Sequence, residues 1–253
     1  MYFDTHAHLD DEKFNTDRFD VIKQIQEEGI SLLVNIGADM ESSYNSVELS
    51  KKYDFIYAAV GVHPYDAPFL KESHIEELRS LAKNEKVVAI GEIGLDYHFP
   101  DTDREGQKEG FKKQLKLAKE LNIPYIIHDR DSHQDCYDII KESGYFNGVM
   151  HCFSGSSEFA KQMLSLGLYI SFAGTVTFKN ANKVKEAAKV VPLDKLLIET
   201  DCPYLSPEPF RGKRNNPSMV KYTLSEIAEI KGVSAEELAK ITMENGKRFF
   251  NIK

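Results

Sequence analysis

Short apolar segments alternate with amphipathic segments along most of this chain. The apolar segments are hydrophobic on both faces, as strands of a buried parallel sheet are, and the amphipathic ones carry the single apolar stripe of a helix. The alternation therefore indicates an α/β protein in which each strand is followed by a helix. The predicted strands are Tyr2–His8, Leu32–Asn35, Ile56–Val60, Val87–Ile90, Tyr125–Ile127, Gly148–Met150, Tyr169–Ser171 and Leu196–Ile198.

Eight strand–helix units favour a closed (β/α)8 barrel, the TIM barrel, over an open doubly wound sheet. Two further helices are predicted after the last strand, at Ser218–Lys231 and Ala235–Phe250. The chain has 253 residues, a length at which such barrels commonly form one domain. We therefore predict a single TIM-barrel domain over residues 1–253, with extra C-terminal helices.

Charge and composition argue against several classes of function. The net charge of −8 disfavours binding of nucleic acid over the whole surface, although it allows a local basic patch. No secretory leader or membrane-spanning run is recognisable, and the three cysteines are scattered, so we expect a cytoplasmic protein without membrane association. No glycine-rich phosphate-binding motif occurs, so no nucleotide cofactor is predicted. We expect a monomer, although composition leaves the oligomeric state open.

Histidines and carboxylates are concentrated at the C-terminal ends of the predicted strands, where barrel enzymes place their catalytic groups. Five of the eight histidines lie there, which a random scatter would not produce. Each alone would be interpreted as a hydrogen-bonded core residue, but together they indicate a metal site. The residues at these positions are His6, His8, His63, Glu92, His128, His151 and Asp201.

Six of these seven residues make a ligand set that is larger than one tetrahedral ion requires. Imidazole and carboxylate ligands suit Zn²⁺, Mn²⁺ or Mg²⁺, so we predict two divalent ions per chain. One ion would be bound by His6, His8 and Asp201, the other by His128 and His151, with Glu92 as the bridge between them.

A pair of ions bound in this way can activate a bridging water and stabilise the leaving oxygen of an in-line displacement. Glu92 and Asp201 are therefore the predicted catalytic residues. Asp201 is expected to accept the proton of the water, because it can touch both the metal and the nucleophile. His63 is predicted to contact the substrate.

The motifs around these residues, taken together and in order, resemble the TatD family of metal-dependent deoxyribonucleases. The resemblance covers essentially the whole chain, and it implies a metal-dependent barrel hydrolase of the wider amidohydrolase type that acts on DNA from an end. The motifs that carry it are Phe3–Asp10, Gly61–Pro64, Gly91–Tyr97, His128–Arg130, His151–Gly155, Glu199–Leu205 and Arg211–Asn215.

Basic residues near the strand ends agree with a phosphate substrate. Arg211, Lys213 and Arg214 form a basic cluster after the last strand and could bind phosphate oxygens by charge-assisted hydrogen bonds. A solvated basic loop is the alternative interpretation. Arg130 follows His128 closely and is a further candidate for phosphate binding. Aromatic residues near the same loops could stack on a base, namely Tyr97, Phe172, Phe178, Tyr204 and Phe210.

The sequence therefore predicts a metal-dependent deoxyribonuclease, an exonuclease that acts on single-stranded or frayed DNA by attack of a water bridging two metals. A hydrolase of an amide, ester, lactone or aminoacyl bond on the same barrel is the first alternative. A nucleic-acid-binding protein without catalysis is the second, and the complete ligand set argues against it. The physiological metal, the polarity of digestion, the preference for DNA over RNA and the cellular pathway are left open by the sequence.

Overall fold

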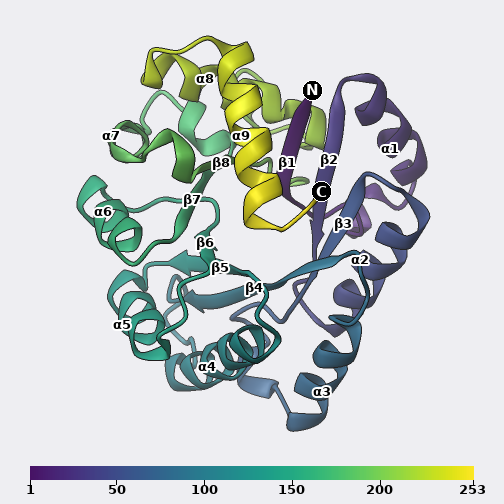
Figure 1. Ribbon diagram of the computed structural model, residues 1–253, viewed down its shortest axis with the longest axis vertical. Helices are drawn as coiled ribbons and strands as arrows, with labels where there is room; N and C mark the ends of the chain where they lie inside the picture. Colours follow the sequence, from purple (N-terminus) through teal and green to yellow (C-terminus); the bar gives the residue numbers. More distant parts are fainter.

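The computed structural model describes residues 1–253 and contains one parallel sheet of eight strands in sequential order, β1 to β8 (Figure 1). The predicted TIM barrel is confirmed. Each strand lies close to its predicted position, because short runs of apolar residues can be buried on both faces of a parallel sheet. The strands are β1 (Tyr2–Ala7), β2 (Ile30–Ile36), β3 (Ile56–Val60), β4 (Val87–Asp96), β5 (Tyr125–Arg130), β6 (Gly148–Met150), β7 (Tyr169–Phe172) and β8 (Leu196–Ile198).

Nine α-helices surround the sheet, and the two helices predicted after the last strand agree with α8 and α9 to within a few residues. None of these helices has the length and apolar character that crossing a lipid bilayer requires. The helices are α1 (Arg18–Glu27), α2 (Met40–Lys52), α3 (Glu72–Leu81), α4 (Arg104–Leu121), α5 (His133–Ser143), α6 (Ser157–Ser165), α7 (Asn182–Val190), α8 (Val220–Lys231) and α9 (Ala235–Phe249).

The first and last strands meet at their C-terminal ends. Ala7 forms a parallel bridge with Cys202 beyond the end of β8. The amide of Asp201 donates to the carbonyl of His6 at 2.9 Å, and the amide of His8 donates to the carbonyl of Cys202 at 2.8 Å. These bonds join the end of β1 to the segment that follows β8, at the place where the predicted ligands lie.

Strand β4 corrects one predicted boundary. The sequence predicts a strand that ends at Ile90 and is closed by Gly91 and Glu92, but β4 continues to Asp96. The glycines allow close contact within the sheet rather than a turn. A Cβ on Gly94, which has φ of +142°, would lie 2.0 Å from the carbonyl oxygen of His128 on β5. Glu92 consequently projects from within a strand.

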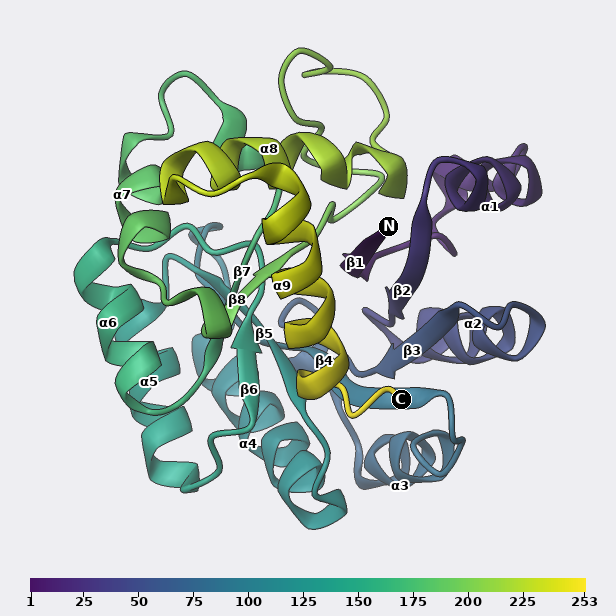
Figure 2. The same cartoon turned by 45° about the horizontal axis from the view of Figure 1, so that its top comes forward.

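The N-terminal end of the barrel is filled by apolar side chains of the C-terminal segment. Helix α9 lies against β1 and β8 (Figures 1 and 2), and Asn245 on it donates to the carbonyls of Leu193 and Leu196 at 2.6 and 2.8 Å. Phe249 and Phe250 are buried in one cluster with Phe3. The cluster is Phe3, Val34, Ile36, Ala59, Val88, Ala89, Ile126, Val149, Tyr169, Leu197, Phe249, Phe250 and Ile252.

Candidate metal centre

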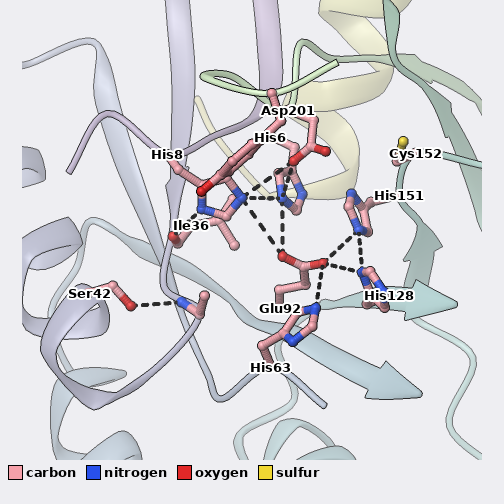
Figure 3. Close-up of polar contacts among 12 residues, drawn as sticks. His6, His8, Ile36, Ser42, His63, Glu92, His128, His151, Cys152 and Asp201 are labelled. Atoms are coloured by element: carbon pink, nitrogen blue, oxygen red, sulfur yellow. Dashed lines mark hydrogen bonds and ion pairs between the residues drawn. The ribbon is translucent and has the colours of Figure 1, made fainter. Parts of the chain in front are cut away.

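Glu92 lies at the centre of the predicted ligands, and its two carboxylate oxygens face different groups of side chains (Figure 3). Its side chain is only 6% exposed. Oε2 faces the imidazoles of His6 and His8, and Oε1 faces those of His128 and His151. The structure therefore brings all six predicted ligands together, with Glu92, the predicted bridge between two ions, in the middle of the other five.

The first group contains four ligand atoms, from β1 and the residue that follows it, from β4 and from the segment after β8. His6 Nε2 and His8 Nε2 are 3.2 Å apart and lie 3.6 and 3.4 Å from Asp201 Oδ1. Glu92 Oε2 lies 3.5 and 3.8 Å from the same two nitrogens. Two ligands of one ion, each at about 2.0–2.1 Å from it, are separated by about 2.9–3.4 Å. The first group therefore has nearly the spacing of a coordination shell.

The second group is more compact. Glu92 Oε1 lies 2.6 Å from His128 Nδ1 and 2.7 Å from His151 Nε2, and these two nitrogens are 3.3 Å apart. The distances to the carboxylate are those of charge-assisted hydrogen bonds between imidazole and carboxylate. All three atoms are potential metal ligands, so a cation can replace the protons that these hydrogen bonds share.

The electrostatics of the centre favour positive charge. Burial alone would raise the pKa of Glu92, but His151 and His128 hold it well below its usual range. Burial opposes the ionisation of Asp201 as well, yet His8 and His6 lower its pKa. The carboxylates in turn raise the pKa of His8 to about 9, although burial acts in the opposite direction. Divalent cations supply the same positive charge when they displace these protons, so the donor set fits metal ions.

Two further carboxylates orient the imidazoles of the second group, and sequence reasoning missed both. Asp96 Oδ2 is 2.9 Å from His128 Nε2, and Glu199 Oε1 is 3.2 Å from His151 Nδ1. Such partners fix the orientation and tautomer of a ligating histidine. Asp96 lies four residues after Glu92 on the same strand, and this even spacing places both side chains on one face. The spacing could have identified Asp96 if the strand had been predicted to continue.

Asp201 is held in an unusual backbone conformation, with φ of 57°. Non-glycine residues in this region are uncommon and concentrate at functional sites. The preceding Thr200 is fixed by the fully buried Asp4, which accepts from the Thr200 amide at 2.9 Å and from its hydroxyl at 2.5 Å. Asp4 also accepts from the amide of His6 at 3.3 Å. One buried Asp side chain therefore aligns β1 with the segment after β8, and both carry predicted ligands.

The centre opens into a cleft of about 1400 Å³. His63 and Arg130, both predicted to contact the substrate, line this cleft. His63 Nε2 is 3.9 Å from Glu92 Oε1, and burial lowers the pKa of His63 to about 4, so the ring is neutral at physiological pH. A neutral imidazole at this distance can contact a bound substrate or serve as a further ligand.

The predicted basic cluster lies outside the lining of this cleft. The guanidinium of Arg214 binds the carboxylate of Asp17 through two bonds of 2.6 and 2.9 Å, and Arg211 stacks on the ring of Phe178 at 4.4 Å. The ammonium of Lys213 lies 5.8 Å from the ring of Phe210. The structure thus gives Arg214 a role in fixing the segment before α1, and phosphate binding by the cluster stays a prediction.

Most of the aromatic residues predicted to stack on a base do not line the cleft and make other contacts. Phe172 is fully buried in the core, so stacking on a base is excluded for it. Tyr97 donates its hydroxyl to Asp135 at 2.7 Å, and Phe210 packs against Tyr222 with ring centres 5.1 Å apart. Only Tyr204 of the predicted set lines the cleft. Position in the sequence indicated nearness to the strand ends but could not indicate which way each ring points.

Comparison with known proteins agrees with the geometry of the centre. The family model described as TatD related DNase matches residues 3–251. The chain is 50% identical to the uncharacterized metal-dependent hydrolase YabD of Bacillus subtilis over the full length of both, and 40% identical to YcfH of Escherichia coli, covering 98% and 95% of the two chains. The crystal structure of YJJV, a TatD homolog from E. coli, superposes with a TM-score of 0.94 at 30% identity and covers 100% of this chain and 98% of that one.

Proposed function

The chain belongs to the TatD-related DNase family and is a metal-dependent hydrolase, and from this premise we propose that it hydrolyses phosphodiester bonds of DNA. The proposed substrate is a single-stranded or frayed end, attacked as an exonuclease. We further propose two divalent ions per chain, Mg²⁺, Mn²⁺ or Zn²⁺, and a monomer that needs no nucleotide cofactor.

One observation carries this proposal: the two oxygens of Glu92 are each shared with a different pair of imidazoles. A carboxylate placed in this way is suited to join two adjacent cations. Divalent ions at such a pair of positions supply Lewis-acid stabilisation of the charges on a phosphodiester and lower the pKa of water. His6, His8 and Asp201 would hold one ion, and His128 and His151 the other.

The chain's own residues supply positions for the proton and the substrate. Asp201 is ionised, because His8 and His6 lower its pKa, so its carboxylate can accept a proton from an attacking water. Arg130 lines the cleft and carries a permanent charge that can bind a phosphate oxygen through its planar guanidinium. The neutral ring of His63 lines the same cleft, 3.9 Å from Glu92 Oε1, and can donate a hydrogen bond to the substrate.

The size of the cleft supports a polymeric substrate. Sites for small molecules usually enclose about 300–1000 Å³. The cleft here measures about 1400 Å³ and extends from the centre over residues of α2, including Asn45 and Lys52. A chain of several nucleotides therefore has room beside the ligands, whereas a small ester would leave most of this space empty.

The proposal is tested with single-stranded oligonucleotides labelled at one end or the other, in parallel with a panel of esters, lactones and amides. Metal-reconstituted protein is expected to shorten the oligonucleotide from one end and to leave the panel largely intact. The variant Asp201→Asn serves to exclude a contaminating nuclease, because it should lose the activity. Rapid hydrolysis of a carbonyl substrate without cleavage of DNA would overturn the proposal.

A further inference from the structure

We propose that Tyr65 and Phe99 form a stacking site for one base of the DNA, at the mouth of the cleft beside the metal centre. This inference rests on the proposed nuclease function and identifies how its substrate is bound. We call the two rings the aromatic shelf. Its ligand class is a nucleobase, and its role is to position the nucleotide next to the phosphate that reacts.

Both rings of the aromatic shelf are exposed. Tyr65 is 43% exposed and Phe99 is 54% exposed, and their ring centres are 5.8 Å apart with an angle of 51° between the planes. Tyr65 lines the cleft, and Phe99 packs beside it. A single exposed apolar residue needs no explanation, but two adjacent exposed aromatic rings next to the cleft indicate a binding surface. The tilt between the rings gives the shelf two faces that meet in a corner.

Tyr65 contacts residues that flank the candidate metal ligands at both ends of its side chain. Its hydroxyl donates to Asp96 Oδ2 at 3.0 Å, and the same oxygen contacts His128 Nε2 at 2.9 Å. Its ring packs edge-on against His63 with centres 4.6 Å apart. The ring is thus held in a fixed position one side chain away from Glu92. A base stacked on it would lie within a nucleotide of the centre.

The surroundings of the shelf match a nucleotide rather than another apolar group. Arg130 on β5 lies opposite Asp96 on β4 in the register of the sheet, and both residues line the cleft. The guanidinium of Arg130 is therefore available near the rings to bind the phosphate. Every base presents a π-face, and a stacked base contributes without any requirement for sequence. By contrast, the cleft-lining ring of Tyr204 is engaged by the ammonium of Lys13 at 4.1 Å, and its hydroxyl donates to Asp11 at 2.6 Å.

The first test is spectroscopic. Oligonucleotides with phosphorothioate linkages, which resist cleavage, carry the fluorescent base 2-aminopurine at each of the terminal positions in turn. Stacking on an aromatic ring quenches this base, so wild-type protein is expected to quench it at one position. Phe99→Leu and Tyr65→Leu should lose this quenching. Tyr65→Phe, which keeps the ring, and Phe146→Leu, an exposed phenylalanine beside the start of β6, should retain it.

The second test is kinetic. Loss of one stacking partner should lower kcat/KM on a normal single strand by about 5- to 100-fold in the two leucine variants. On a strand that lacks the base at the quenched position, the same variants should match the wild-type protein. Equal quenching and equal kcat/KM in the wild-type protein and both leucine variants would overturn the shelf and leave the nuclease function standing. Wild-type protein that cleaves no DNA would overturn both.

Discussion

The two ends of this barrel are built from opposite kinds of side chain. At the C-terminal end, five other buried or half-buried candidate ligands surround the carboxylate of Glu92, which is ionised despite its burial. At the N-terminal end, Phe250 of the C-terminal segment packs on Phe3 and on Phe249, and no candidate ligand belongs to their cluster. Burying charged groups at the C-terminal end destabilises the fold. Burying apolar surface at the N-terminal end stabilises it.

This difference indicates which residues can be substituted with an effect on stability but not on catalysis, and which with the reverse effect. Residues at the N-terminal end should affect the free energy of unfolding and leave the chemistry unchanged. Residues around Glu92 should do the reverse, because their geometry is selected for ligands rather than for packing. Variants at each end either strengthen this division or break it.

The largest expected effect is on catalysis. Glu92→Gln keeps the size of the side chain but removes the charge that joins the two groups of imidazoles, so kcat/KM should fall by at least about 1000-fold. The free energy of unfolding should change far less than this loss of activity suggests. Initial rates on a labelled single strand measure the effect, with Glu236→Gln on the exposed face of α9 as the control. A variant that kept a tenth of the activity would break the division.

The second effect is on stability. Phe250 is 2% exposed, and Phe250→Ala should lower the free energy of unfolding by about 3–5 kcal/mol through lost burial and the cavity left behind. The activity of the folded fraction should not change. Urea denaturation followed by circular dichroism gives the first quantity, and rates under folding conditions give the second. Phe146→Ala, at a position that is 38% exposed, is the matched control and should cost much less.

The third effect concerns the carboxylates behind the ligands. Asp96→Asn removes the charge that orients His128 and should weaken metal affinity or activity by about 10- to 100-fold. The concentration of Mn²⁺ that gives half-maximal activity should rise. Asp101→Asn, in the loop after β4, is the control. An unchanged metal dependence would show that Asp96 has no part in orienting the ligand.

The smallest effect concerns Arg214, for which sequence and structure give different roles. Its ion pair with Asp17 joins side chains that are 35% and 37% exposed, so Arg214→Ala should lower stability by no more than about 1 kcal/mol. Asp17→Asn should have the same effect, and the KM for an oligonucleotide should be unchanged in both. A tenfold rise in KM that occurs in Arg214→Ala but not in Asp17→Asn would restore the predicted role in phosphate binding.

Most of the fold was predictable because the spacing of apolar residues in a short stretch of sequence distinguishes a buried strand from an amphipathic helix. The proximity of the six candidate ligands was predictable because a parallel barrel gathers its strand ends in one place, so that His6 and Asp201 become neighbours. The end of β4 was not predictable, because glycines such as Gly91 and Gly94 are common in turns, whereas here they permit close contact between strands. The partner of Arg214 was not either, because Asp17 lies 197 residues away and only the closed barrel brings them together.

The central claim is that Glu92 joins two divalent ions in one hydrolytic site. It is tested most directly by measuring the metal content per chain, together with cleavage of an end-labelled single strand, for wild-type protein and Glu92→Gln reconstituted with Mn²⁺ or Zn²⁺. Two ions per wild-type chain, fewer than two in the variant, and cleavage by the wild-type protein alone are the expected results. Full cleavage by a chain that binds a single ion, or by the variant, would contradict the account.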